Sequence, residues 1–396
     1  MPKVYAFLRS VKYRINYNKE LRDDKLFLKK KLLNYYNSKT KENNSFTTNQ
    51  EKVLKSIRSN REIELPNKVV IEINNTCNLD CLMCKTSLST RKKGKMEVDT
   101  FKNIIDYCKK NNIFNIELHT IGDPLMSPIL DQVLEYLKKK KMFVGLGTNG
   151  LLIKKRFSIL KKYESTISML DISIDSPEKE TYEILRAKGN FEELLENLEI
   201  AKNDLNIKLK VSMTLSKVNR HLIGKFIEFS KNYVENLSKD INFGIIGSLS
   251  PDSSFFDQNN IFPEQTYSNR LCGNMVGESL NFHINGDLSI CARDYDGSLV
   301  IGNINNDNAK NILNNSEKFR EIKNRHVNNE LTGPCATCKV VEDDIGDILK
   351  FIMNVALKKF NKKNYSFFDE MFNLFHKFIE KPSQVHLEKL LKKIEI

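Results

Sequence analysis

Two hydrophobic patterns alternate through the middle of the chain and predict a mixture of strands and helices. Short runs rich in β-branched residues, such as 68–73 and 208–215, predict strands. Longer segments with apolar residues three or four positions apart, such as 98–110 and 191–204, predict amphipathic helices. The same criteria place further strands at 114–120, 142–147, 169–174 and 242–246, and further helices at 129–139, 157–163 and 223–234.

Strands and helices alternate about six times between residues 66 and 250. Repeated strand–helix alternation is typical of a parallel sheet with helices packed outside it, so the fold class is α/β. In such folds, ligands bind at the carboxyl ends of the strands. Side chains that follow the predicted strands are therefore the first candidates for a functional site.

The pattern changes on both sides of this core, 66–250. Residues 1–65 predict a basic helical N-terminal extension, with a loose polar stretch inside it, and a linker precedes a smaller unit with its own cysteines at 265–342. Residues 343–396 carry two helical stripes of apolar residues, which predict amphipathic helices that dock on the protein. The stripes include Ile348, Ile352, Met353, Phe368, Met371 and Phe372.

Positive charge is concentrated at the two ends of the chain. The 396 residues carry a formal net charge of +13. Residues 1–60 hold 15 Lys and Arg against 5 Asp and Glu, and residues 350–396 hold 10 against 5. Basic ends can indicate a nucleic-acid, membrane-surface or acidic-peptide partner, but a solvated helix face has the same composition and is the favoured interpretation. Nucleic acid is therefore not the expected partner.

Cysteine usage and hydropathy bear on the compartment. The sequence opens without the pattern of a secretory signal, and no apolar run is long enough to span a bilayer. Eight cysteines are few for a disulfide scaffold, and C-x2-C spacing favours metal binding in a reducing compartment. We therefore expect a cytoplasmic protein with a globular core, in line with its hydrophobic content of 40%.

Three cysteines follow the first predicted strand of the core. Cys77, Cys81 and Cys84 form a C-x3-C-x2-C motif. Three thiolates are one fewer than a structural zinc site needs, whereas a cubane iron–sulfur cluster held by three thiolates keeps one iron for another ligand. Zinc with a distant fourth ligand remains the alternative.

The motif, followed by about six strand–helix units, resembles the radical SAM family over roughly residues 66–250. The resemblance implies a partial (β/α)6 TIM-like barrel in which Cys77, Cys81 and Cys84 bind a catalytic [4Fe–4S] cluster. S-adenosylmethionine (SAM) would chelate the fourth iron, and reductive cleavage would give a 5′-deoxyadenosyl radical that abstracts hydrogen from a substrate. An electron donor such as flavodoxin or ferredoxin is the implied partner.

A turn after the second predicted strand carries the same resemblance. Gly122 and Asp123 are similar to the family's G-G-E-P turn, which helps hold the methionyl amino group of SAM. The chain departs from it with Ile121 for the first Gly and Asp for Glu, which keeps the charge but shortens its reach. Gly, Asp and Pro also form ordinary turns, so a purely structural role is the alternative.

Further SAM contacts are implied by the resemblance. Ser173 and Asp175 are expected on one face of the fourth predicted strand, because strand side chains alternate, and would contact the SAM ribose or carboxylate. Arg186 would pair with the carboxylate, and Met83 would lie near the adenine. A helix cap or a surface arginine is the alternative for these polar residues. His119 is expected to be a buried histidine bonded to a neighbour, in preference to a substrate contact.

Four more cysteines fall in the second unit, at Cys272, Cys291, Cys335 and Cys338. Between them, residues 285–287 (Asn-Gly-Asp) predict a hairpin turn. The arrangement resembles a shortened SPASM/Twitch domain, which implies one auxiliary [4Fe–4S] cluster closed by four thiolates. A cluster without an open iron suits electron transfer. A zinc ribbon is the alternative interpretation.

These features predict a radical SAM enzyme of the oxidoreductase type. No recognisable peptide-binding module occurs in residues 1–65, which favours a small sugar- or nucleotide-like metabolite as substrate. A peptide or protein maturase of the same family is the alternative, with the basic ends holding an acidic partner. A hypothesis of another class is a zinc-stabilised nucleic-acid-binding protein.

Overall fold

The computed structural model describes residues 19–37, 48–59, 62–245, 254–259, 272–336, 338, 348–349, 351–353, 355–357 and 366–395. Of the predicted linker, residues 251–270, only 254–259 lie within these ranges, and of the polar stretch at 38–50 only 48–50. Within the described parts, no helix combines the length and the apolar character needed to cross a bilayer.

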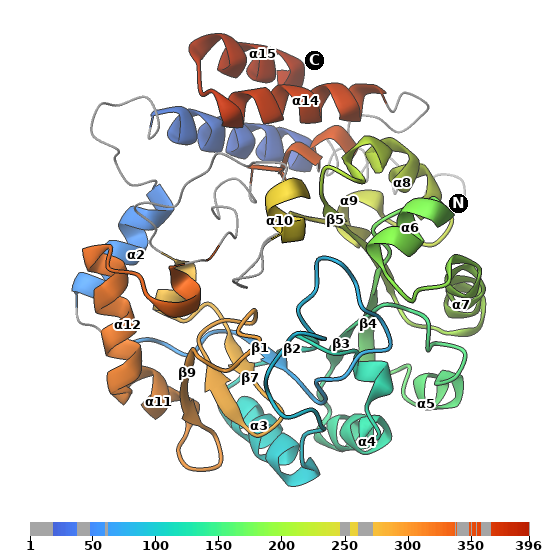
Figure 1. Ribbon diagram of the computed structural model, residues 1–396, viewed down its shortest axis with the longest axis vertical. Helices are drawn as coiled ribbons and strands as arrows, with labels where there is room; N and C mark the ends of the chain where they lie inside the picture. Colours follow the sequence, from blue (N-terminus) through green and yellow to red (C-terminus); the bar gives the residue numbers. More distant parts are fainter. Residues whose placement is uncertain are drawn as a thin grey trace, which may run out of the picture.

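Six parallel strands form the centre of the molecule (Figure 1). They are β1 (Lys68–Ile71), β2 (Asn115–Leu118), β3 (Val144–Thr148), β4 (Ile167–Ser173), β5 (Leu209–Leu215) and β6 (Ile241–Ile245). Each strand pairs in parallel with the next along the chain. Among the described residues β6 is one edge of the sheet, so the barrel is partial, as predicted.

Helices connect the strands and cover their outer face. They are α3 (Val98–Lys110), α4 (Leu130–Lys140), α5 (Phe157–Lys162), α6 (Lys179–Leu185), α7 (Phe191–Asp204) and α8 (Ile223–Ser230). The predicted bounds of α3 and α7 are confirmed. The sequence pattern missed α6, because its buried residues are only Tyr182 and Leu185 and give too short a periodic signal.

Alternation along the strands explains why this sheet has a solvated inner face. In β5, Leu209, Val211, Met213 and Leu215 are buried, while the intervening polar residues are half-buried and line an inner cavity. Successive strand side chains point to opposite faces, so the apolar row packs on the helices and the polar row faces inward. The interior is therefore available for a ligand.

A three-stranded extension joins the sheet on the far side of β1. It consists of β7 (Leu280–Phe282), β8 (Asp287–Ser289) and β9 (Val300–Asn303), with α11 (Ala309–Asn315) and α12 (Glu317–Asn328) beside it. The predicted hairpin is confirmed, since β7 and β8 are antiparallel and Gly286 has a φ of +86°. The predicted second unit is not separate from the core, because β7 pairs in parallel with β1 and continues the barrel sheet. The β1 edge is thereby covered.

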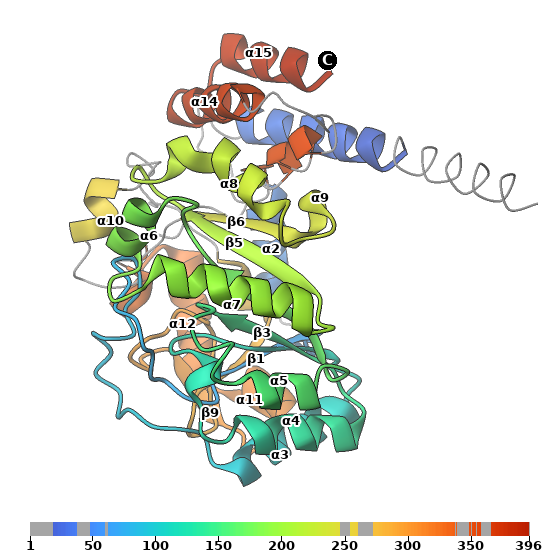
Figure 2. The ribbon, with the colours of Figure 1, turned by 90° about the vertical axis from the view of Figure 1, so that its right-hand side faces the viewer.

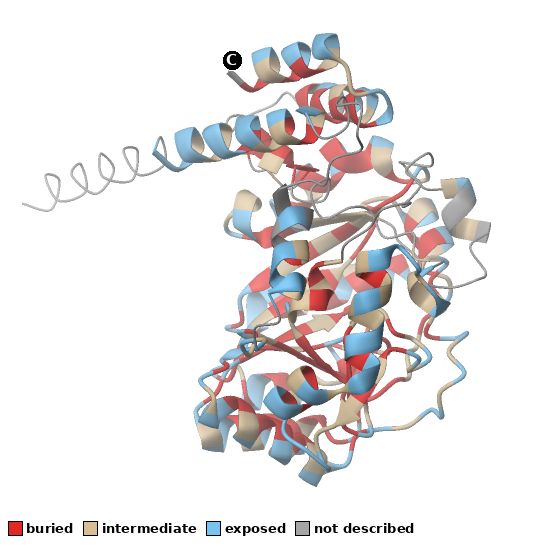
Figure 3. Cartoon of the chain, turned by 90° about the vertical axis from the view of Figure 1, so that its left-hand side faces the viewer, coloured by how far each residue is buried: buried red, intermediate tan, exposed pale blue. Residues whose placement is uncertain are grey.

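The first and last described helical segments pack together at one end of the molecule (Figure 2). Residues 19–37 contact the helical residues 351–353, with the Phe27 and Phe351 rings 4.3 Å apart, and the C-terminal helices, with the Tyr35 and Phe378 rings 5.7 Å apart. The C-terminal helices are α14 (Ser366–Glu380) and α15 (Gln384–Glu395). Their apolar stripes are buried, as Figure 3 shows in red, so the predicted docking on the protein is confirmed.

Short elements complete the fold. They are α2 (Thr48–Arg58), η1 (Pro124–Met126), η2 (Arg220–Leu222), α9 (Leu237–Asp240), α10 (Ser254–Asn259), η3 (Gly273–Val276) and η4 (Gly333–Cys335). Of these, η1 follows the Gly122–Asp123 turn, and η3 and η4 adjoin cysteines of the second set.

Candidate functional site

The first cysteine motif lies on a long loop after β1, at the carboxyl end of the barrel. Backbone pairing closes the base of the loop, with an isolated bridge between Asn74 and Lys95 and a hydrogen bond from Asn75 N to Gly94 O of 3.2 Å. Its outgoing arm is held on the barrel by two further backbone bonds of 3.0 Å, from Asp80 N to Ala187 O and from Leu82 N to Leu185 O. The loop is therefore fixed at its base and along one side.

The three thiols of this loop, Cys77, Cys81 and Cys84, line the same cavity and influence one another electrostatically. Burial raises the pKa of Cys77 to about 12, and burial likewise raises that of Cys81. Both groups are therefore thiols at neutral pH without a metal, and ligation must displace their protons. Three soft sulfur donors on one cavity wall suit an iron–sulfur cluster.

Gly122 is required by its position beneath this loop. Its φ is +82°, and a Cβ there would lie 2.7 Å from Asn74 O and 2.9 Å from Thr76 O. Only glycine fits such a close approach of two backbone segments. The turn therefore supports the loop, and the amide of Asp123 also donates to Thr76 O at 2.9 Å.

The Asp123 carboxylate is buried and engaged within the protein. It accepts hydrogen bonds from Leu125 N at 2.9 Å, from Asn149 N at 2.8 Å and from Thr148 Oγ1 at 2.8 Å. Desolvation raises the pKa of this carboxyl, opposed by these bonds. The Asp123 carboxylate, on a side chain shorter than that of Glu, thus binds the turn and the end of β3.

Asn149 is a site residue that was not predicted from the sequence pattern. Its Nδ2 lies 3.6 Å from Cys77 Sγ and donates to Asn78 Oδ1 at 2.8 Å. The turn Thr148-Asn149-Gly150 follows β3, and only the fold brings it onto the cysteine loop. Asn149 thus orients the first thiol.

The predicted pair Ser173 and Asp175 does not share one strand face. β4 ends at Ser173, which lines the cavity, while Asp175 has a φ of +65° and is fully buried. Its Oδ2 lies 2.7 Å from Arg186 Nη2, and its Oδ1 accepts from Thr214 N at 2.6 Å. The shared face was a wrong prediction, because the strand turns before Asp175.

Arg186 lies against the cysteine loop. Its Nη1 is 3.8 Å from Cys81 Sγ, and it also lines the cavity. Burial opposes its charge, but the carboxylate of Asp175, with additional contributions from Cys81 and Tyr182 in their ionised forms, outweighs burial and raises the pKa of Arg186. A permanently charged guanidinium thus faces the space beside the thiols.

The cavity has a volume of about 720 Å³ and runs along the inside of the barrel. Met83 lines it as expected, and so does His119. The expectation of a buried histidine is wrong, since 43% of the His119 side chain is exposed, although its Nε2 does contact Glu117 Oε2 at 2.9 Å. Gly147 leaves room for this ring, because a Cβ there would lie 3.1 Å from His119 Cβ. Cys108, outside the site, is fully buried.

The second cysteine set comes from three segments. Cys272 precedes η3, Cys291 follows β8, and Cys335 ends η4 three residues before Cys338. Burial raises the pKa of Cys291 to about 11, and the Cys338 thiol adds to the shift, so these two lie close together. All four are half-buried. Four thiols from one small unit suit a cluster closed by protein. Within the described residues, no group of three or more His, Cys, Asp or Glu is arranged to hold a single metal ion.

Comparison with known proteins agrees with both cysteine sites. The profile of the radical SAM superfamily matches residues 71–229, and the SPASM iron–sulfur cluster-binding domain matches residues 272–339. The former uses a [4Fe–4S] cluster and SAM, and the latter holds auxiliary iron–sulfur clusters. The chain therefore has the predicted cofactors.

Two curated relatives and one solved structure are similar to parts of the chain. The antilisterial bacteriocin subtilosin biosynthesis protein AlbA of Bacillus subtilis is 27% identical over 45% of this chain and 42% of its own length. The mycofactocin maturase MftC of Mycolicibacterium smegmatis is 22% identical over 70% of this chain and 76% of its own length. The crystal structure of Streptococcus suis SuiB bound to precursor peptide SuiA has a TM-score of 0.54 at 14% identity, and covers 69% of this chain and 70% of SuiB.

The match to AlbA thus spans less than half of that relative, and the likeness to SuiB shows the fold. Together with the two domain matches, the fold and the two cysteine sites lead to one assignment: the chain belongs to the radical SAM superfamily and carries a C-terminal SPASM iron–sulfur domain.

Proposed function

We propose that the protein is a radical SAM enzyme that abstracts a hydrogen atom from its substrate. The observation that carries the proposal is the placement of Cys77, Cys81 and Cys84 on one wall of the barrel cavity, within the matched radical SAM domain. When bound, the cluster and SAM supply a 5′-deoxyadenosyl radical for hydrogen abstraction. The protein's own part is to hold and orient these groups and the substrate.

The cavity wall provides the proposed SAM contacts. Met83, Gly122, Ser173 and Arg186 line the cavity and are proposed to contact SAM, with Arg186 as the cation for its carboxylate. Asp123 orders the turn beneath the cysteine loop, and it is also among the residues that line the cavity. Asp175 is bonded to Arg186, so we assign it the task of holding that arginine in place.

The second site is proposed to hold one auxiliary [4Fe–4S] cluster through Cys272, Cys291, Cys335 and Cys338. Because four protein thiolates leave no open iron, this site suits electron acceptance from the substrate radical, which would make the reaction an oxidation. For this reaction we propose two domains, the core at 66–250 and the auxiliary unit at 265–342, flanked by the helical ends at 1–65 and 343–396. We place the enzyme in the cytoplasm, with a flavodoxin or ferredoxin as electron donor.

A peptide is the substrate class that we propose, on the names of three of the similar proteins. AlbA is a bacteriocin biosynthesis protein, MftC is a maturase, and SuiB was solved with a precursor peptide. The expectation of a small metabolite came from the absence of a recognisable peptide-binding module in the sequence. We give that argument less weight than the names of AlbA and MftC and the precursor peptide bound to SuiB. We therefore propose peptide or protein maturation.

A small polar metabolite remains the second candidate, because of the inner wall of the barrel. Charged and polar side chains line the cavity at Lys68, Glu117, His119, Asp171 and Lys210. Such a wall suits a hydrophilic ligand that enters the barrel whole.

Anaerobic reconstitution with iron and sulfide tests the core of the proposal. We expect brown, oxygen-sensitive protein with about eight irons per chain if both cubanes form. With dithionite and SAM it should release 5′-deoxyadenosine. Colourless protein saturated with zinc and unable to cleave SAM would instead support the zinc-stabilised nucleic-acid-binding hypothesis. Short peptides encoded beside the gene, assayed by mass change, then separate the two substrate classes.

A further inference from the structure

The return arm of the first cysteine loop, residues 85–93, is bonded to the second cysteine unit. Ser89 Oγ and Arg91 Nε both donate to the carbonyl oxygen of Tyr295, each at 2.7 Å. Thr90 donates to Asp296 Oδ1 through its amide at 2.8 Å and through its hydroxyl at 3.1 Å. The two cysteine sites are thus joined by four hydrogen bonds, contributed by three consecutive residues.

Arg91 also reaches a buried carboxylate at the end of β1. Its Nη1 and Nη2 each lie 2.8 Å from an oxygen of Glu72, which is only 1% exposed. Glu72 further accepts hydrogen bonds from Thr120 Oγ1 at 2.9 Å and from Ile284 N at 3.3 Å. One buried carboxylate therefore ties together β1, the end of β2, the cysteine loop and the β7–β8 hairpin. A planar guanidinium suits this task, because it offers two donors to the carboxylate and a third to Tyr295.

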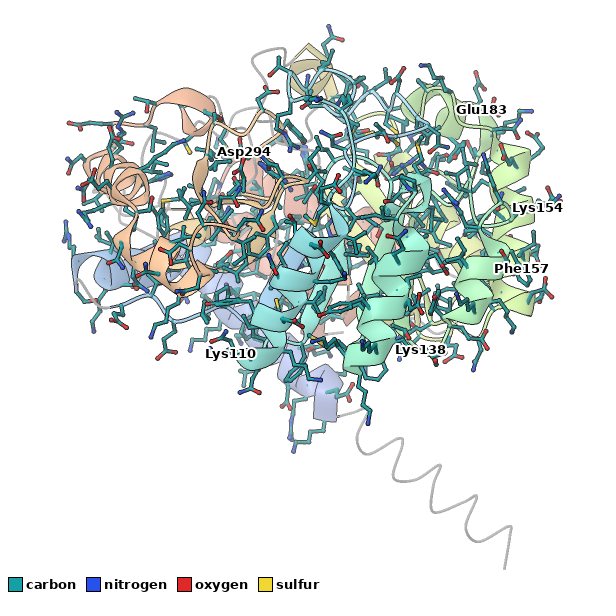
Figure 4. All side chains as sticks on the ribbon, turned by 90° about the horizontal axis from the view of Figure 1, so that it is seen from below. Lys110, Lys138, Lys154, Phe157, Glu183 and Asp294 are labelled. Atoms are coloured by element: carbon teal, nitrogen blue, oxygen red, sulfur yellow. The ribbon has the colours of Figure 1, made fainter. Side chains whose placement is uncertain are left out.

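The turn held by Arg91 is rigidly connected to Cys291. Asp294, 3% exposed, accepts from Ser289 Oγ at 2.8 Å and from Leu299 N at 3.0 Å, while its own amide donates to Cys291 O at 3.1 Å. Figure 4 shows Asp294 within the second unit, across the molecule from Lys154 on the barrel. Because these bonds close the turn on both sides, a displacement of Tyr295 would also move Cys291.

The other end of the connection leads to Cys84. The Cys84 Sγ lies 3.0 Å from Thr86 Oγ1, and that oxygen accepts from Gly122 N at 3.2 Å. Lys93 Nζ donates to Thr86 O, so the return arm is also cross-linked within itself. The arm, through its own chain and these hydrogen bonds, therefore connects Cys84 to the turn that holds Cys291.

Tyr295, which accepts two of these bonds through its carbonyl oxygen, also lines the barrel cavity. Arg293 and Cys84 line the same cavity. Burial raises the pKa of Tyr295 to about 12.

We propose that Glu72 and Arg91 are positioning residues that hold the first cysteine loop and the turn after Cys291 at one fixed separation. The proposal goes beyond the proposed function, since it concerns the geometry between the two sites and holds for either class of substrate. Electron transfer between two centres depends steeply on their separation, so a fixed spacing would serve the oxidation proposed above.

Arg91→Lys separates positioning from simple charge balance. Lysine keeps a cation beside Glu72 but has a single ammonium, which cannot bind both carboxylate oxygens and Tyr295 O at once. We expect a melting temperature close to wild type, with hydrogen exchange of residues 294–299 at least several-fold faster. Arg91→Met leaves a buried carboxylate unpaired and should loosen both segments and lower the melting temperature.

The first measurement is hydrogen exchange on the purified, cluster-loaded protein. The same data would also reveal incomplete loading, because a missing cluster would speed exchange around its cysteines. Electron paramagnetic resonance of the reduced protein is the second, because the magnetic interaction between two paramagnetic centres follows their separation. The matched control is Glu196→Gln, which breaks the exposed pair between Lys154 and Glu196 far from both sites. The control should change neither readout.

The proposal is overturned if Arg91→Lys leaves exchange in residues 294–299 and the magnetic interaction as in wild type. It is also overturned if Arg91→Met changes exchange uniformly over the chain, since that is a loss of stability alone. Should Arg91→Met not fold, the double variant Ser89→Ala/Thr90→Ala decides, because it removes the two side-chain bonds of Ser89 and Thr90 among the four connecting bonds and leaves the buried pair intact. Faster exchange of residues 294–299 in this variant would support the connection, and unchanged exchange would overturn it. Failure of SAM cleavage in wild type would refute the proposed function without touching the exchange result.

Discussion

The two cysteine sites are built in different ways, and the contrast shows what a local motif can and cannot specify. Cys77, Cys81 and Cys84 lie within eight residues on one loop, while the second set extends from Cys272 to Cys338. The first loop is held by backbone bonds to its own base and to the barrel. The second set depends on a hairpin, two short helical turns and their packing on β1. The first site is thus a local structure, and the second is a product of tertiary folding.

Removal of a thiol from the first site should have the largest effect. We expect Cys81→Ala to lower 5′-deoxyadenosine formation by roughly 10³-fold or more, because the variant loses a proposed ligand of the catalytic cluster. About four of about eight irons should remain, in the second site. The measurements are chromatography of 5′-deoxyadenosine and an iron assay on anaerobic protein.

Cys108→Ala is the matched control, since Cys108 is fully buried in α3 and lies outside the cavity. It should keep both iron content and SAM cleavage. If the Cys81→Ala variant cleaved SAM at the wild-type rate, the assignment of the first site would be contradicted.

Removal of a thiol from the second site sharpens the contrast. Cys335→Ala should lose about half of the iron but still cleave SAM, because the first loop does not need the second set to hold its cluster. Product formation from the true substrate should be lost. A variant that forms product as well as wild type would refute an essential role for the auxiliary cluster.

Gly122→Ala tests whether the first loop depends on the turn below it. The added Cβ would meet Asn74 O and Thr76 O in a left-handed backbone, so we expect a loss of about 1–3 kcal/mol in the free energy of unfolding. SAM cleavage should fall roughly tenfold or more as the loop shifts. Urea denaturation and the SAM-cleavage assay measure the two effects.

Gly94→Ala is the control at the other side of the loop base. Its Cβ would meet only Ile284 Cδ1, at 3.7 Å, so the free energy of unfolding should change by about 0.5 kcal/mol or less. Equal effects of the two variants would show that the close backbone approach at Gly122 has no special weight.

The smallest effect is expected inside the barrel, at Glu117. Burial opposes its charge, but hydrogen bonds from His119 and Lys68 outweigh burial and lower the pKa of this carboxyl to about 2. A lowered pKa in the folded state stabilises the protein above the ordinary pKa of Glu, near 4.5, and the contribution is lost as the pH falls towards 2.

Glu117→Gln should therefore cost about 1–2 kcal/mol at pH 7, after allowance for solvent screening. The difference from wild type should persist down to about pH 5 and shrink below about pH 4. Urea denaturation of both metal-free proteins over this pH range is the measurement. A difference that grows as the pH falls would have the opposite sign and would contradict the pairing.

The sequence by itself determined the features that depend on neighbouring residues. Strand and helix periods, the three-cysteine loop and the hairpin turn at Gly286 follow from side-chain spacing and backbone preference over a few residues. The resemblance to the radical SAM family rests on the same local patterns. It identified cysteines that fall within the two matched domains, and their role as cluster ligands stays a prediction.

Only the tertiary structure decided which distant residues meet. Asp175 pairs with Arg186, β7 completes the sheet beside β1, and His119 faces a cavity in place of a core. Arg91 connects Glu72 to Tyr295, more than 200 positions further along the chain. Such contacts depend on how whole strands and helices pack, and no periodicity within a segment carries that information. Local pattern therefore fixed the chemistry that the chain can host, and packing fixed the geometry in which it is held.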